Sequence, residues 1–209
     1  MQRTRRPSLD HPPADGALPL TLRLLAPYLS IGLFWLLLEN GWLALLGYHA
    51  QILFWARGRR PGLPVPRGRA LLTGLPSLVA GPALYFLLPH ITRVDLGGWL
   101  DRFHVSGWAL VLLIPYYGLV HPVLEQRHWG PLRNRTHLSH LFFAGYHALV
   151  LFSLVSVPWL LFGIALLLGA SVAWQVLARR TGGMMVPAAI HIGSDLGLIT
   201  AAWLRVAGG

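Results

Sequence analysis

Ionisable side chains are scarce in this chain, and three groups of them are placed where they could do chemistry. Glu125 follows His121 by four residues, so a helix would place both on one face. His147 and His191 lie inside two later apolar segments, and Asp195 follows His191 at the same four-residue spacing. A carboxylate and two imidazoles around one wet cavity would suit water activation by a general base and hydrogen-bond stabilisation of an oxyanion.

Each group also has a purely structural explanation. Glu125 stands beside Arg127 near a helix end, where it could pair or reach the membrane interface. His147 could bond a serine or a backbone carbonyl, and His191 with Asp195 could form an ion pair between helices. An ionisable group at membrane depth is expensive, however, and usually faces the interior of a helix bundle. The three groups together therefore favour one functional cluster.

The composition is that of an integral membrane protein. Mean hydropathy is +0.55, 55% of residues are apolar and 11% are charged. The 17 basic residues give a formal charge of +10 but form short clusters between apolar segments, so we expect a lipid bilayer and no nucleic acid as partner. The absence of cysteine excludes disulfides, thiolate metal ligands and a cysteine nucleophile.

Apolar segments long enough to cross a bilayer define the expected architecture. A spanning helix needs about 20 residues, which predicts spans at 70–91, 107–126, 137–157, 158–178 and 183–204. Residues 20–56 are long for one span and short for two; we favour one long or broken helix, with a tight hairpin at 39–41 as the alternative. The predicted fold class is an all-α, polytopic transmembrane helix bundle of six or seven spans.

Arginines alternate along the connecting segments and predict the topology. Segments that begin at 57, 127 and 179 carry five, three and two arginines, which places them in the cytoplasm. The arginines of the N-terminal tail also favour the cytoplasm, which requires an even number of crossings before residue 57 and supports the hairpin. We therefore predict a multi-pass protein located in a prokaryotic plasma membrane.

Three motifs resemble, in order, those of the CPBP family, the CAAX proteases and bacteriocin-processing enzymes also called the Abi family. The family signature is Glu-Glu-x-x-x-Arg, then Phe-x-x-x-His, then His-x-x-x-Asn or Asp, on successive helices. Phe143 and His147 match the second motif, and His191 and Asp195 match the third. The lead-in "RRTGG" also resembles the turn that precedes the last histidine in the family.

The first motif departs from the family pattern. Glu125 matches the first glutamate, Gln126 replaces the second, and Gly130 stands where arginine is expected. Arg127 or Arg133 could take the place of that arginine in space.

The resemblance implies an intramembrane glutamic endopeptidase that acts on a protein or peptide substrate at the membrane. In it Glu125 activates water, His147 and His191 position that water and stabilise the transition state, and Asp195 orients a ring. Four residues are expected to support the site: His121, Gln126, Phe143 and Arg127. The implied domains are a disordered cytoplasmic tail at 1–19, N-terminal transmembrane helices and loops at 20–106, a CPBP-like catalytic core at 107–204 and a tail at 205–209.

Three other interpretations stay open. The expected site holds no cofactor, but two histidines and a glutamate also form a catalytic zinc set. The altered first motif is compatible with a catalytically weak or inactive relative that acts as a membrane binding or immunity protein. A transporter with a proton relay is disfavoured because paired repeats are absent from the sequence. The oligomeric state is left open.

Overall fold

The computed structural model describes residues 17–57 and 63–208. Within these ranges the chain is helical and forms no strand, which confirms the all-α fold class. Most of the predicted N-terminal tail and the last residue of the predicted C-terminal tail lie outside the described residues. Residues 17–19 already belong to the first helix, α1 (Ala17–Ser30).

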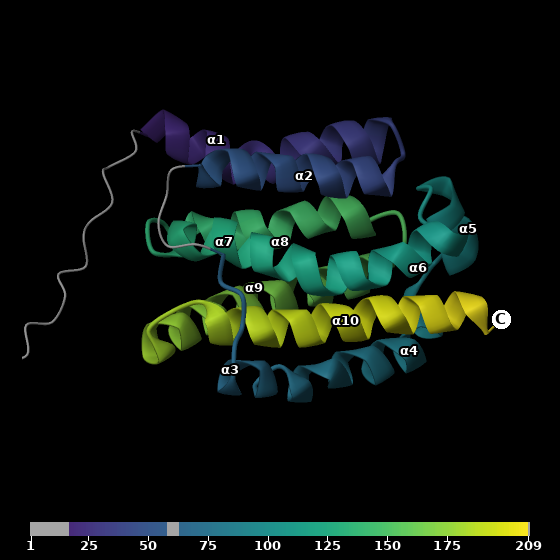
Figure 1. Ribbon diagram of the computed structural model, residues 1–209. Helices are drawn as coiled ribbons and strands as arrows, with labels where there is room; N and C mark the ends of the chain where they lie inside the picture. Colours follow the sequence, from purple (N-terminus) through teal and green to yellow (C-terminus); the bar gives the residue numbers. More distant parts are fainter. Residues whose placement is uncertain (1–16, 58–62, 209) are drawn as a thin grey trace, which may run out of the picture.

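The first apolar region is a hairpin, so the long helix that we favoured is wrong. Helix α1 continues as a π-helical segment, η1 (Ile31–Leu37), and α2 (Gly41–Ala56) returns beside it (Figure 1). The reversal needs Glu39 in the left-handed region, with φ of 49°. Asn40 then caps α2, because its side chain accepts a hydrogen bond of 2.9 Å from the Leu43 N–H.

Glu39 is held at this reversal by the guanidinium of Arg102, which binds its carboxylate. This hydrogen bond lowers the pKa of Glu39 below its usual value. The carboxylate therefore stays charged, and the pair intact, until the pH falls through that lowered value. The few acidic residues of the chain thus include one with an evident role in the turn.

The remaining helices follow in chain order. They are α3 (Arg69–Leu72), η2 (Leu75–Val79), α4 (Ala80–Ile91), α5 (Leu96–Arg102), α6 (Gly107–Pro115), η3 (Tyr116–Val120), α7 (His121–Arg133), α8 (Leu138–Leu151), α9 (Val157–Thr181) and α10 (Met185–Ala207). The segments η2 and η3 are short 3-10 and π-helical turns, respectively, within longer helical runs.

Five of these runs are long and apolar enough to cross a membrane, as expected of a multi-pass membrane protein. They are Pro19–Leu37, Arg69–Ile91, Gly107–Arg133, Val157–Thr181 and Met185–Ala207. Large apolar side chains cover the outside, and Trp108 at 81% exposure and Phe86 at 72% are examples. A surface of this kind fits lipid and does not fit water.

Two of the predicted spans are corrected. The span at 137–157 is α8, whose 14 residues extend about 21 Å and do not meet the length criterion for crossing. The span at 107–126 continues to Arg133, because α7 buries 11 of its 13 residues against other helices. The apolar sequence ends near Glu125, but α7 continues because its polar side chains find partners inside the bundle.

The arrangement of the helices brings the arginine-bearing segments to one end. Figure 1 shows the beginning of α1, the end of α2, the beginning of α8 and the turn between α9 and α10 at the left, with α5 and the C-terminus at the right. Helices α7, α8 and α10 lie between the α1–α2 hairpin and α4 (Figure 1). The hairpin therefore returns the chain to the arginine-rich end, as the alternation of charges requires.

Glycines let α10 approach the α3–α4 run at backbone distance. A Cβ atom on Gly193 would collide with the carbonyl oxygen of Gly74 and the hydroxyl of Ser77. A Cβ atom on Gly197 would lie 2.8 Å from the amide nitrogen of Gly81. Small residues permit such close packing in membranes. Because Gly193 lies between His191 and Asp195 in the chain, this contact also fixes the position of both.

We expect Gly193→Ala to destabilise the bundle by about 2 to 3 kcal/mol, since the added methyl meets backbone that cannot give way. Denaturation of the purified protein in mixed micelles measures this loss. Gly163→Ala, on α9 where a Cβ would meet open space, is the matched control and should cost nothing. Equal stability of the two variants would contradict the close contact.

Candidate active site

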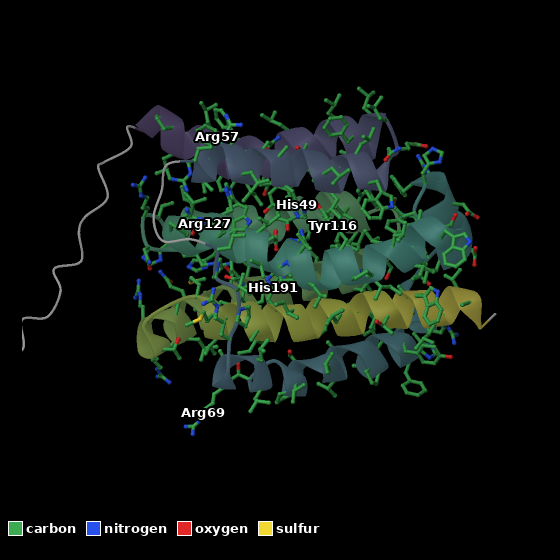
Figure 2. The ribbon with its side chains drawn as sticks, viewed as in Figure 1. His49, Arg57, Arg69, Tyr116, Arg127 and His191 are labelled. Carbon is green, nitrogen blue, oxygen red and sulfur yellow. The ribbon has the colours of Figure 1, made fainter. Side chains whose placement is uncertain are left out.

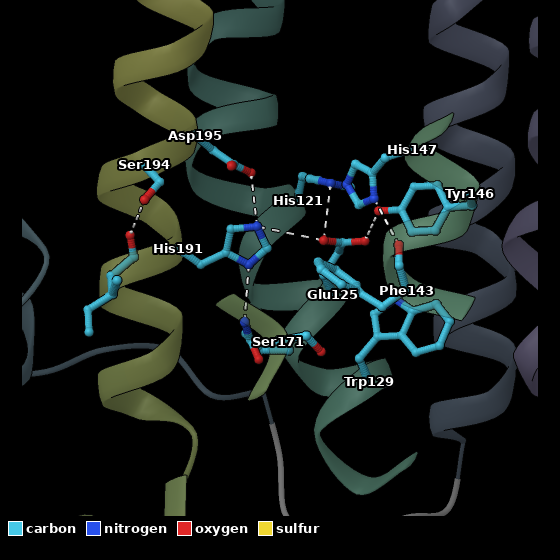
Figure 3. A network of polar contacts seen from close by, with 12 residues as sticks. His121, Glu125, Trp129, Phe143, Tyr146, His147, Ser171, His191, Ser194 and Asp195 are labelled. Carbon is cyan, nitrogen blue, oxygen red and sulfur yellow. Dashed lines mark hydrogen bonds and ion pairs between the residues drawn. The ribbon is translucent and has the colours of Figure 1, made fainter. Parts of the chain in front are cut away.

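Glu125 lies at the centre of the cluster and is fully buried, with 0% exposure. Its Oε1 accepts a 2.8 Å hydrogen bond from the hydroxyl of Tyr48 and a second one from Tyr146 (Figure 3). Its Oε2 has no hydrogen-bond partner among the described residues. Instead Oε2 faces Nε2 of His121 and Nε2 of His191, each at 3.6 Å. One carboxylate oxygen is thus held, and the other points between two imidazoles.

Helix α7 presents this face to the bundle after a change of helical pitch. The π-helical η3 immediately precedes His121, and such turns are frequent at functional sites because they rotate the following residues relative to a regular helix. His121 and Glu125 then share a face by their four-residue spacing. The predicted pairing on α7 is therefore present in the structure.

His191 and Asp195 come from α10 and face the same point. His191 Nε2 lies 3.3 Å from Asp195 Oδ2, and its ring stacks on Trp174 with centroids 4.3 Å apart. Its Nδ1 lies 3.1 Å from Nε2 of Gln126, which follows Glu125 on α7. The structure thus brings Glu125, His191 and Asp195 together and places Gln126 beside them.

The hydrogen bonds around Gln126 determine which nitrogen of His191 carries the proton. The guanidinium of Arg133 only donates, and its Nη1 lies 2.8 Å from Gln126 Oε1. The amide nitrogen of Gln126 must therefore face His191 Nδ1 and donate to it. A neutral His191 then carries its proton on Nε2, directed at the two carboxylates. A donor group consequently stands opposite Glu125 Oε2.

Arg133 lies inside the cluster, beside Gln126. It is 2% exposed, and its Nε donates to the Ser171 hydroxyl at 2.9 Å, while its guanidinium lies over the rings of Phe143 and Trp174. Of the two arginines that the sequence offered, Arg133 contacts Gln126. Arg127, which we expected to support the site, is half-buried on α7 (Figure 2).

His147 joins the cluster from α8 by way of Tyr146. Its ring stacks on Tyr146 at 4.0 Å between centroids, and the Tyr146 hydroxyl binds Glu125. Its Nδ1 donates to the carbonyl oxygen of Phe143 at 2.8 Å, which leaves Nε2 as an acceptor in the neutral ring. His147 can therefore accept a proton as it stands, but it can stabilise an oxyanion only after protonation. Phe143 itself is fully buried.

Several residues of the cluster were not singled out in the sequence. Tyr48 and Tyr146 hold Glu125 Oε1, and the indole N–H of Trp129 donates to the Tyr48 hydroxyl at 2.7 Å. His49 on α2 binds His121 at 2.9 Å. His49 could have been found, because it is an ionisable residue inside an apolar helix, the criterion that selected His147. The tyrosines carry no such signal, since tyrosine is common in apolar helices.

The cluster is closed in this structure, whereas the sequence suggested a wet cavity. Glu125 is fully buried, and His191 and Asp195 are each 5% exposed. Helix α2 places Tyr48 directly on the carboxylate. Access for a substrate would therefore require the helices around Glu125 to move apart.

Within residues 17–57 and 63–208, no group of three or more histidine, aspartate and glutamate side chains has the spacing of a metal site. Both nitrogens of His191 already face side-chain partners, Gln126 on one side and the carboxylates on the other. The arrangement fits hydrogen bonding by His191 better than ligation.

Comparison with known proteins gives no match. A scan against protein-family models, a search of the curated proteins and a search of the solved structures each found nothing that matches this chain.

Proposed function

We propose that this protein is an intramembrane endopeptidase of the CPBP type, in which Glu125 acts as a general base on water. The supporting observation is the free Oε2 of a fully buried carboxylate, which faces two imidazole nitrogens at 3.6 Å. That separation is too long for a direct hydrogen bond and suits one bridging water. A base and a hydrogen-bond donor then lie side by side, and the proposed reaction needs a water to enter between them when the helices separate.

In the proposed reaction Glu125 Oε2 takes a proton from the water while the water oxygen attacks the carbonyl carbon of a peptide bond. The oxygen of the tetrahedral intermediate accepts a hydrogen bond from His191 Nε2–H. The carbon–nitrogen bond then breaks, and the proton on Glu125 passes to the leaving amine. The hydroxyl from water stays on the new carboxyl group, and Glu125 returns to its charged form.

Neighbouring groups prepare each participant in this scheme. Tyr48 and Tyr146 hold Oε1, so rotation of the carboxylate is restricted and Oε2 stays directed at the histidines. Asp195 faces the Nε2–H of His191 and favours the ring orientation that Gln126 imposes from the other side. His147 would serve as a further proton acceptor for the attacking water.

The cellular setting belongs to the same proposal. Five spans of apolar sequence and arginine-rich segments at one end of the bundle fit a plasma membrane with that end in the cytoplasm. We propose a prokaryotic host, and as substrate a membrane-associated protein or peptide whose scissile bond enters the bundle. Opening between α2 and the core would admit it.

A second candidate is a non-catalytic relative that binds a membrane peptide or confers immunity. The complete burial of Glu125 favours it, because a closed carboxylate with two tyrosine partners is also a stable structural arrangement. Gln126 in place of a second carboxylate supports the same interpretation.

A processing assay with the purified protein tests the proposal. Peptides and sorting tails encoded beside this gene are incubated with the protein in lipid nanodiscs, and new termini are identified by mass spectrometry. Cleavage that depends on Glu125 is expected. Binding without cleavage would replace the endopeptidase with the non-catalytic candidate.

Chelation is expected to leave cleavage intact, because Glu125 and His191 act by proton transfer and hydrogen bonding in this scheme. Activity is compared before and after exhaustive dialysis against a chelator and after addition of zinc. Loss of cleavage on chelation with recovery on zinc would assign the reaction to a metal mechanism.

A further inference from the structure

Four exposed arginines lie at the arginine-rich end of the bundle, where α3 begins and α9 turns into α10. They are Arg67, Arg69, Arg179 and Arg180, and we name this set the arginine patch. Arg179 and Arg180 stand in the last turn of α9, while Arg69 is the first residue of α3. Figure 2 shows Arg69 directed away from the bundle at this end.

The packing of α10 against the α3–α4 run brings the two halves of the patch to the same side of the bundle. A Cβ atom on Gly74 would meet the carbonyl of Ala189, and further along a Cβ atom on Gly81 would meet Gly197, so the two runs are parallel. Arg69 therefore lies toward the beginning of α10, which follows the end of α9 after a short turn.

The two ends of the bundle differ in surface charge. The described residues include five carboxylate side chains, and none of them forms an ion pair with the arginine patch. Glu39, Asp95 and Asp101 lie at the opposite end, in the turn before α2 and around α5 (Figure 1). Glu125 and Asp195 are buried in the candidate active site. A negatively charged ligand would therefore complement the patch.

Lipid-facing side chains continue directly from the patch. Leu71 and Leu72 follow Arg69 on α3, and Val176 precedes Arg180 by four residues on α9; all three apolar side chains are exposed. Residues four apart share a face of a helix. Cations and an apolar surface therefore adjoin in the order of a phospholipid, in which a phosphate stands above acyl chains. A water-soluble acidic partner would leave the apolar half uncovered.

The tendency of arginines to stay on one side of a membrane explains the end at which they lie, but not how they are grouped. Arginines that are scattered around the helix ends, or paired with carboxylates, would satisfy that tendency equally well. The arginine patch instead combines exposure, the lack of a carboxylate partner among the described residues and an adjoining apolar surface.

We propose that the arginine patch binds the headgroup of an anionic phospholipid, whose acyl chains lie along α3 and α9. A guanidinium can donate two parallel hydrogen bonds to phosphate oxygens. Each arginine near an anionic membrane surface strengthens attachment by about fivefold. The inference does not depend on the proposed peptidase reaction.

Stepwise lipid binding to the purified full chain tests the proposal. Phosphatidylglycerol and phosphatidylcholine are titrated separately in detergent, and native mass spectrometry counts the bound lipids. The first phosphatidylglycerol is expected to bind at least about 10-fold more tightly than the first phosphatidylcholine, because only phosphatidylglycerol carries a net charge. This preference should shrink as the salt concentration rises, since salt screens exposed charges.

Arg179→Gln combined with Arg180→Gln is expected to weaken the binding of phosphatidylglycerol by at least about 10-fold and to leave that of phosphatidylcholine unchanged. Arg179→Lys combined with Arg180→Lys keeps the charge and should retain most of the preference. Arg69→Gln tests the other half of the patch and should weaken binding of phosphatidylglycerol by about fivefold. The control is Arg205→Gln, which changes an exposed arginine in the last turn of α10 at the opposite end and should alter neither affinity.

Equal affinity for the two lipids, unchanged binding of phosphatidylglycerol by either glutamine variant, or equal weakening by Arg205→Gln would each overturn the proposal. If the double glutamine variant does not fold, Arg69→Gln decides alone. Displacement of the lipid by soluble glycerophosphate at the same concentration would assign the patch to a free phosphate compound, and displacement by a soluble acidic peptide would assign it to a protein partner. Failure of the peptidase assay leaves the result intact, because lipid binding is measured without a substrate.

Discussion

Glu125→Gln is expected to lower substrate processing by at least about 100-fold while the protein stays folded in the membrane. Glutamine keeps the size of the side chain, and its amide oxygen can still accept from Tyr48 and Tyr146 at the Oε1 position. The Oε2 position becomes an NH₂ group, which cannot take a proton from water. The amide would also point its hydrogens at the Nε2–H of His191, so the arrangement for water is lost as well.

Initial rates of cleavage in nanodiscs measure this effect. Glu39→Gln is the matched control, because it changes the chain's other glutamate at an exposed turn outside the cluster. It should cleave like the unaltered protein. Processing of the natural substrate at the original rate by Glu125→Gln would remove the catalytic assignment and leave the binding or immunity role.

His191→Phe is expected to reduce kcat by about 10² to 10³-fold with little change in KM, because the lost Nε2–H donor acts on the developing oxyanion. Phenylalanine preserves the stacking on Trp174, so the packing of α10 is retained. The amide of Gln126 loses its acceptor, which costs about 1 to 3 kcal/mol of folding free energy. Thermal denaturation in detergent separates this stability loss from the kinetic one.

Steady-state cleavage at several substrate concentrations gives kcat and KM separately. His137→Phe, an exposed histidine at the beginning of α8, is the control and should leave both constants unchanged. A rise in KM at constant kcat for His191→Phe would assign His191 to substrate binding. It would contradict its proposed role toward the intermediate.

Local sequence was sufficient to predict features that depend on the spacing of residues along a single helix. Apolar segments predicted the helical bundle because lipid requires long apolar helices. The four-residue spacings of His121 with Glu125 and of His191 with Asp195 predicted shared faces, since these pairs are neighbours on any helix. Because Glu125 and His191 lie in apolar segments, the sequence also predicted that their side chains face the interior of the bundle. Both side chains are buried, which confirms this prediction.

Local sequence was not sufficient to predict where helices begin and end when their ends contact residues far away in the chain. Arg102, 63 residues away in the chain, binds Glu39 at the reversal. From local sequence alone we favoured one long or broken helix over 20–56 and kept a hairpin as the alternative. Helix α7 continues to Arg133 because Ser171 and Gln126 receive the guanidinium inside the bundle. A hydropathy criterion treats Arg133 as a polar residue outside the span, so the predicted span ended before it.

By itself the sequence determined that helices would span a membrane and that a glutamate and histidines would point inward. Only the tertiary structure decided what surrounds them. Tyr48 reaches Glu125 across 77 residues of chain and His49 reaches His121 across 72. Arg133 fixes the amide of Gln126 and hence the proton of His191. The physical reason is that a spacing of four residues fixes a neighbour on one helix, whereas the packing of several helices fixes a neighbour on another.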